Sequence, residues 1–190
     1  MATEDSLVSA TAFHPRQVSA CLHLLEEKKW VRCIEGRVNG IVITRAGQEA
    51  HRTFLRNSLY PVPVTEEVYA RFAVLNDQFK AVCTAWQVRP DGQPNDHSDP
   101  TYDRSVLAQL WVVHEAVALI LRDLALVARH FERYEERLND AVNRVSHGDR
   151  SALLLPLSNS YHDIWMELHH DLRLAVEVAD TQVSSSQEVE

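Results

Sequence analysis

The sequence predicts a mainly α-helical fold with one small β-hairpin in its N-terminal part. Hydrophobic residues recur at helical spacing in four segments of the C-terminal two-thirds, and only five glycines interrupt the 190 residues. Over 33–44, hydrophobic and polar residues alternate around a turn that contains Asn39 and Gly40, a pattern typical of two paired strands. A composition of 45% hydrophobic and 24% charged residues is that of an ordinary globular protein.

The four C-terminal segments have recognisable starts and ends. Thr65 and Asp99 are suited to N-cap positions, Pro100 to a first helical turn and Gly148 to a C-cap. The expected helices span about 65–88, 99–130, 134–145 and a last segment that begins near Ser158 or Ser160. Because all four are amphipathic and their connections are short, we predict an antiparallel four-helix bundle.

Proline and charge patterns divide the chain into units. Pro61 and Pro63 cannot continue a helix, so we expect one domain over 1–58 and a second, helical domain over 65–179. The Ser-, Gln- and Glu-rich segment 180–190 is expected to be a disordered tail. The whole chain has a net charge of -8, whereas 14–56 holds eight Lys or Arg and four Glu, a net of +4. A basic module therefore precedes an acidic one.

The basic module has its own order of elements. A short helix is expected over 5–13, and Pro15 opens a second, whose apolar side carries Val18, Cys21, Leu22, Leu24 and Leu25. The hairpin follows over 33–44. Thr44 then caps a further helix that begins at Arg45.

This order resembles the winged helix-turn-helix of MarR-like bacterial transcriptional regulators. The segment 18–31 (VSACLHLLEEKKWV) is similar to their recognition helix running into the first wing strand. The segment 43–47 (ITRAG) is similar to their leucine-threonine-x-alanine-glycine exit from the wing. The resemblance covers about a quarter of the chain, and the helix that precedes the pair in that family has no counterpart before Pro15.

The helical half faintly resembles an uncharacterised actinobacterial domain that is sometimes joined to phosphoenolpyruvate-utilising proteins. The segments that carry this resemblance are Trp86-Gln87, 95–99 and 160–169.

The resemblance implies a cytoplasmic, homodimeric regulator that binds double-stranded DNA. The exposed face of the second helix and the wing tip offer the candidate DNA contacts, which are Arg16, Gln17, Ser19, His23, Arg37 and Asn39. A dimer is expected because one recognition helix reads too few base pairs. The alternative is a non-DNA-binding protein-interaction or accessory module with a helical ligand-binding domain, in which these residues form a solvated face.

A small-molecule effector could contact the aromatic residues of the helical half. The candidate residues for this are Trp86, His97, Trp111, Tyr161, His162, Trp165 and His169. An apolar pocket with a few polar groups is the usual form of such sites. The simpler alternative, favoured on the same criterion, is that these side chains fill a core.

Other chemistry is not indicated. The sequence has no nucleophile elbow, phosphate loop or cofactor motif, so we expect neither an enzyme nor a cofactor. Glu167 and His170 form half of a di-iron motif without its second copy, and no metal is expected. Cys21, Cys33 and Cys83 are expected to be small buried hydrophobes. No apolar run is long enough to predict a membrane span.

Overall fold

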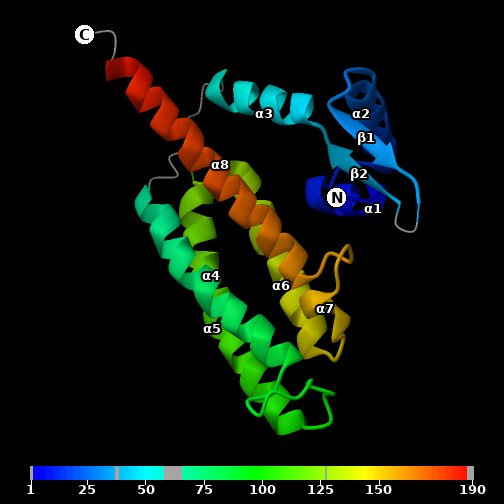
Figure 1. Ribbon diagram of the computed structural model, residues 1–190, viewed down its shortest axis with the longest axis vertical. Coiled ribbons are helices and arrows are strands. Elements are labelled where there is room, and N and C mark those ends of the chain that lie inside the picture. The colour runs from blue at the N-terminus through cyan, green and yellow to red at the C-terminus, as the bar shows by residue number, and fades with distance from the viewer. Residues whose placement is uncertain (1, 37–38, 58–65, 127, 188–190) are drawn as a thin grey trace.

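The computed structural model describes residues 2–36, 39–57, 66–126 and 128–187. Within these ranges the protein is mainly helical with one small antiparallel sheet, as predicted (Figure 1). The elements are α1 (Glu4–Thr11), α2 (Pro15–Glu27), β1 (Val31–Ile34), β2 (Gly40–Ile43), α3 (Arg45–Asn57), α4 (Glu66–Gln87), α5 (Pro100–Ala125), the 3-10 turn η1 (Arg129–Phe131), α6 (Glu132–Ser146), α7 (Ser151–Leu154) and α8 (Tyr161–Gln187). The proline-rich boundary at 60–64 and the expected cap Thr65 lie outside the described residues.

The N-terminal half, residues 2–57, is built on capped helices and a hairpin. Thr3 caps α1, since its Oγ1 accepts a hydrogen bond from the Ser6 N–H at 3.1 Å. In the hairpin, Val31 pairs with Ile43 and Ile34 with Gly40. The backbone of Ala2 forms a further, isolated antiparallel bridge to the hairpin, because the Ala2 N–H donates to the Ile41 carbonyl at 2.9 Å and the Ile41 N–H donates to the Ala2 carbonyl at 2.7 Å. The hairpin is therefore tied to the start of α1.

One hydroxyl and one glycine join the hairpin to α3. The Thr44 Oγ1 donates to the Lys29 carbonyl at 2.7 Å and accepts from the Gly47 N–H at 3.0 Å. A Cβ on Gly47 would lie 2.1 Å from the Trp30 carbonyl oxygen, far inside contact distance. The predicted capping role of Thr44 is confirmed, and Gly47 has a steric reason to be glycine: the backbone of Trp30 occupies the space of a side chain.

The buried side of α2 differs from the prediction. Val18 is buried and Leu22 and Leu25 are half-buried, but Cys21 and Leu24 are exposed, Leu24 by 58%. Only Val18, Leu22 and Leu25 point inward, which is about one residue in each turn of α2. The inward stripe is narrow because the main contacts of α2 are with α1 and β1 only. The expectation of buried cysteines was also wrong for Cys33, which is exposed, whereas Cys83 is half-buried.

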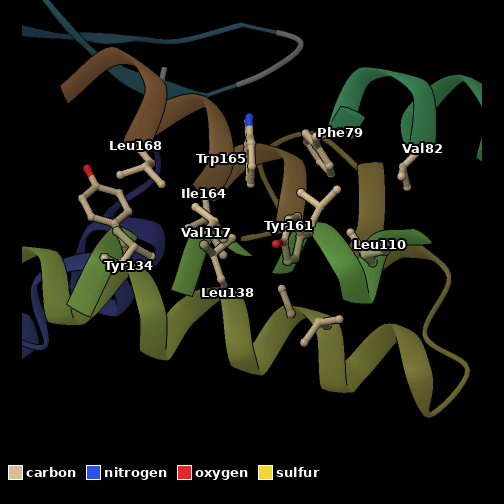
Figure 2. Close-up of a cluster of buried hydrophobic side chains, with 14 of the residues drawn as sticks. Phe79, Val82, Leu110, Val117, Tyr134, Leu138, Tyr161, Ile164, Trp165 and Leu168 are labelled. Carbon is tan, nitrogen blue, oxygen red and sulfur yellow. The ribbon is translucent and has the colours of Figure 1, made fainter. Parts of the chain in front are cut away.

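The helical half, residues 66–187, encloses the main core. Helix α4 contacts α5, α5 contacts α6, α6 contacts α8, and α8 returns to α4. All four helices send large apolar side chains into the space between them (Figure 2). The fully buried residues include Phe72, Phe79, Leu110, Val117, Leu138, Tyr161, Ile164, Trp165, Leu168 and Leu172.

Most of the predicted helix ends in this half are confirmed. The Asp99 side chain accepts hydrogen bonds from the Thr101 and Tyr102 N–H groups, and Pro100 occupies the first turn of α5. Gly148, after α6, has a φ of +99°, a conformation that favours glycine. Two predictions differ from the structure. Helix α5 ends at Ala125 and is followed by η1, and α8 continues as helix to Gln187 through most of the segment expected to be a disordered tail.

Helix α5 is long and apolar enough, by length and composition alone, to cross a membrane. Buried core helices pass the same test, and 44% of its apolar window is buried inside the protein. The exposed side of α5 carries the apolar residues Trp111, Val112 and Leu119 together with polar and charged ones.

Gly47→Ala is expected to destabilise the N-terminal half by about 1–3 kcal/mol or more, because the added methyl would displace the Trp30 backbone. Hydrogen exchange of the β1, β2 and α3 amides measures this, and these amides should exchange faster in the variant. Gly36→Ala is the matched control, since a Cβ added there would meet nothing within 4 Å and its effect should be small. Equal protection in both variants would contradict the steric account.

Candidate functional site

The outward side of α2 is exposed and carries several of the predicted DNA contacts. Arg16, Ala20, His23 and Glu27 recur at spacings of three and four, so they form one row opposite Val18 and Leu22. All four are exposed. The side chains of Arg16 and His23 make no hydrogen bond or ion pair within the described part of the chain. The outer row therefore offers a cation and an imidazole to a partner.

Two of the other predicted DNA contacts, Gln17 and Asn39, have hydrogen-bond partners within the protein. The Gln17 Oε1 accepts from the His14 N–H at 3.0 Å, and the His14 Nδ1 accepts from the Arg16 N–H at 3.2 Å, so this pair caps α2. Ser19 is half-buried. Asn39 is exposed, but its Oδ1 accepts from the Gly36 N–H at 3.1 Å. Arg37 lies outside the described residues.

Further cations surround this row. Lys28, Lys29 and Arg32 are exposed at the end of α2 and on β1. The Lys28 Nζ lies 4.5 Å from the centre of the Trp30 ring, in cation–π contact. Glu26 and Glu27 dilute the charge of the last turn of α2, which leaves Arg16 at the helix start as the cation of the outer row.

The seven predicted ligand contacts do not gather at one place. Tyr161 and Trp165 are completely buried, and the Trp165 Nε1 donates to the Asn76 Oδ1 at 3.0 Å. The Phe79 ring lies 4.6 Å from that of Trp165 (Figure 2). These side chains therefore fill the core, which was the simpler alternative.

The remaining candidates lie apart from that centre. The His97 ring lies 4.5 Å from the Trp86 ring between centres and is tilted by 47° to it, at the loop between α4 and α5. His169 contacts Tyr69, with 3.1 Å from its Nε2 to the tyrosine hydroxyl. Trp111 is 37% exposed, on the outside of α5. The loop that carries His97 is held near the start of α7, since the His97 carbonyl accepts a hydrogen bond from the Arg150 side chain at 3.1 Å.

A buried histidine in α5 was missed by the sequence analysis. His114 is 4% exposed, with its Nδ1 3.3 Å from the Tyr161 hydroxyl and its Nε2 2.9 Å from the Asn139 Oδ1. Because an amide oxygen only accepts, Nε2 carries the proton and Nδ1 accepts from the tyrosine. Burial lowers the pKa of His114 below its usual 6.5, against a smaller opposing effect of the Asn139 hydrogen bond. The apolar spacing of Leu110, Val113 and Val117 places position 114 on the inner side, and that signal could have found it.

Cavities lie along the contact between the two halves, where α1 meets α6 and α3 meets α8. We call this contact the seam. Two of these cavities have volumes of about 420 and 350 Å3. The first is lined by Ser6, Leu157, Asn159, His162, Asp163, Met166, Glu167 and His170, and the second by Ala10, Thr11, Phe13, His130, Arg133, Tyr134, Arg137, Glu167 and Asp171. Of the predicted ligand residues, His162 lines one of them.

Polar side chains hold the helical side of the seam in place. The Arg137 guanidinium donates to Glu167 at 2.6 Å, and its side chain is 10% exposed. The Tyr134 hydroxyl donates to the Asp171 carboxylate at 2.5 Å. Burial, together with the nearby Asp171 charge, raises the pKa of Tyr134. No group of three or more metal-ligating side chains is found among the described residues.

Comparison of the chain with protein-family models, curated proteins and solved structures finds no match.

The unfolding free energy is expected to fall as the pH is lowered below about 6.5. Burial lowers the pKa of both His114 and His169, so the folded protein holds them neutral while the unfolded chain binds protons. The stability associated with the neutral histidines is fully present above their pKa in the unfolded chain. It is lost as the pH falls from that value toward their lower pKa in the folded protein. Each of the two histidines can contribute at most about 1.4 kcal/mol per pH unit.

Urea unfolding at several pH values measures this slope. His114→Gln should lower stability at neutral pH, since Tyr161 and Asn139 lose their partner, and should also flatten the slope between pH 7 and 5. An unchanged slope in this variant would show that His114 does not titrate as described.

Proposed function

We propose that the protein is a DNA-binding transcriptional regulator, with a winged helix-turn-helix over its N-terminal half and a four-helix bundle over its helical half. The observation that carries this proposal is the outer row of α2, which is exposed, begins with Arg16 and is joined to a two-stranded wing. The order of α1, α2, the hairpin and α3 supports it, as does the +4 charge of 14–56.

The dimensions of α2 suit the major groove of DNA. A helix with its side chains is about 10–12 Å across, and the groove is about 12 Å wide. Helix α2 packs against α1 and β1, so its outer row is not covered by the helical half. In this arrangement the Arg16 guanidinium reads a guanine edge and His23 lies about two helical turns further along the groove.

The two capping residues have a different role in this proposal. Gln17 and Asn39 hold the helix start and the wing turn through their side-chain oxygens. Their amide nitrogens are left to donate to phosphate oxygens, which position the module without reading sequence. Specificity is therefore concentrated at Arg16 and His23.

A small-molecule effector of this regulator is assigned to the seam and not to the aromatic core. A ligand between α1 and α6 or α8 would change how the N-terminal half sits on the helical half, whereas the core around Trp165 is filled. Such a ligand would meet Arg137 and Glu167 on one side and α1 on the other.

A second candidate function, protein binding, has one observation in its favour. Leu24 on α2 is 58% exposed and Phe13, just before α2, is 54% exposed. Exposed apolar residues mark a protein contact where they gather into one patch. This function would replace DNA binding if the protein does not shift duplex DNA at low salt.

Arg16→Ala should weaken binding to a selected DNA site and relax the preference at one base position by about 1–3 kcal/mol. Selection of bound sequences from a random duplex library, followed by electrophoretic shift assays, measures both effects. Arg104→Ala is the matched control, because Arg104 is an exposed arginine at the start of α5, remote in sequence from the N-terminal half, and its loss should change neither quantity. If the two variants behave alike, or if the wild type shifts no duplex at low salt, the DNA-binding proposal is wrong.

A further inference from the structure

Helices α6 and α8 form a ladder of polar side chains beside the seam. The Arg137 guanidinium donates to Glu167 at 2.6 Å. The Tyr134 hydroxyl donates to Asp171 at 2.5 Å. Because the position on α8 rises as the position on α6 falls, the two helices run antiparallel. Arg133 precedes Arg137 by four residues and Asp171 follows Glu167 by four, so both lie about one helical turn from the ion pair, in the same direction.

This second level of the ladder is not closed by an ion pair. Arg133 is half-buried, and its side chain makes no hydrogen bond or ion pair within the part of the chain that the structure describes. Asp171 is half-buried as well, and it accepts the Tyr134 hydroxyl but has no cationic partner among the described residues. Arg133 and Asp171 therefore keep their charges uncompensated, whereas Arg137 and Glu167 neutralise one another.

Both uncompensated charges line the same cavity of the seam. Its volume is about 350 Å3, within the range of small-molecule pockets, about 300–1,000 Å3. The N-terminal half contributes Ala10, Thr11 and Phe13 to its lining, and Phe13 is 54% exposed. The cavity thus presents one cation, one carboxylate and an apolar wall to a ligand.

The other titratable groups of this cavity do not change that balance. Arg137 and Glu167 pair with each other. Desolvation lowers the pKa of His130 below its usual 6.5, against a smaller opposing effect of the Asp171 charge, so this imidazole is neutral at pH 7. A ligand that satisfies the cavity therefore needs one negative and one positive group.

We propose that the cavity binds an apolar α-amino acid as a zwitterion. The carboxylate of the ligand accepts from the Arg133 guanidinium, its ammonium group donates to the Asp171 carboxylate, and its side chain lies against Phe13. Charge-assisted hydrogen bonds of this kind are the strong ones in proteins.

Other classes of ligand match the cavity less well. A carboxylic acid without an amine would place a second negative charge beside Asp171. An amine without a carboxylate would leave Arg133 without a partner. A neutral apolar molecule would cover both charges and pair neither, which is unfavourable.

The bound amino acid would connect α1 with α6 and α8. Helix α1 packs on α2, the helix that begins the outer row with Arg16. Occupancy of the cavity would therefore restrict how α2 sits relative to the helical half. This consequence rests on the proposed DNA-binding function, but the tests of the site use no DNA, so a failure of amino-acid binding and a failure of DNA binding are separate results.

Isothermal titration calorimetry of the full chain tests the class of ligand. The probes are L-valine, L-leucine, L-isoleucine, L-methionine and L-phenylalanine, each alone and at up to about 10 mM. At least one should bind. Its N-acetyl derivative, which lacks the ammonium group, and its amide, which lacks the carboxylate, should each bind about tenfold or more less tightly. Binding of none of the five, or equal binding of either derivative, would overturn the proposal.

Substitutions test the two charges of the site. Arg133→Gln and Asp171→Asn each remove one charge, and an asparagine amide oxygen can still accept the Tyr134 hydroxyl. Each variant should bind the amino acid about tenfold or more less tightly than the wild type. Arg129→Gln is the matched control, because the Arg129 side chain is 90% exposed and does not line this cavity, so its affinity should be unchanged. Equal affinities of the Arg133→Gln and Arg129→Gln proteins would contradict the assignment.

Hydrogen exchange of the wild type locates the ligand and does not depend on the stability of a variant. With the tightest-binding of the five amino acids added, the amides of residues 4–13 should exchange more slowly, since the ligand lies against α1 and Phe13. The amides of α4 should be unchanged. Protection that omits residues 4–13 would place the ligand elsewhere and overturn the proposal.

Discussion

Helix α8 joins the core of the helical half to the N-terminal half through its two sides. Its inner side buries Tyr161, Ile164, Trp165 and Leu168 between α4, α5 and α6, and full burial of such side chains stabilises the fold by about 1.5–3 kcal/mol each. Its other side contacts α3 and, with α6, lines the seam (Figure 1). Because the inner side is close-packed, the outer side is held rigidly, and the N-terminal half is placed against a fixed surface.

The seam is less well packed than the core, and this difference has a functional consequence. The helical half presents polar and charged groups there, including Arg137, Glu167 and Asp171, and cavities of several hundred Å3 remain between the halves. A contact with voids and solvated charges holds two bodies together more weakly than an apolar core does.

Local sequence signals predicted where helices and strands begin and end better than they predicted which of their residues are buried. Capping residues and turn glycines, such as Asp99 and Gly148, act within a few residues, so the helix ends followed from the sequence. Which side of a helix is buried depends on its neighbours, and α2 has few, so Cys21 and Leu24 were assigned wrongly. The hydrogen bonds that occupy Gln17 and Asn39, and the pairing of His114 with Asn139, link side chains whose geometry no residue pattern specifies. The seam is formed by segments more than a hundred residues apart in the sequence, and no local pattern in the sequence predicted that they meet.

The claim that α2 faces DNA is tested most directly by mapping the contact on the protein. Hydrogen exchange would be measured by mass spectrometry with and without a random-sequence duplex at low salt. The proposed function predicts slower exchange over α2 and the hairpin, residues 15–43, with α4 and α5 unchanged. Protection confined to the helical half, or no protection at any salt concentration, would contradict it.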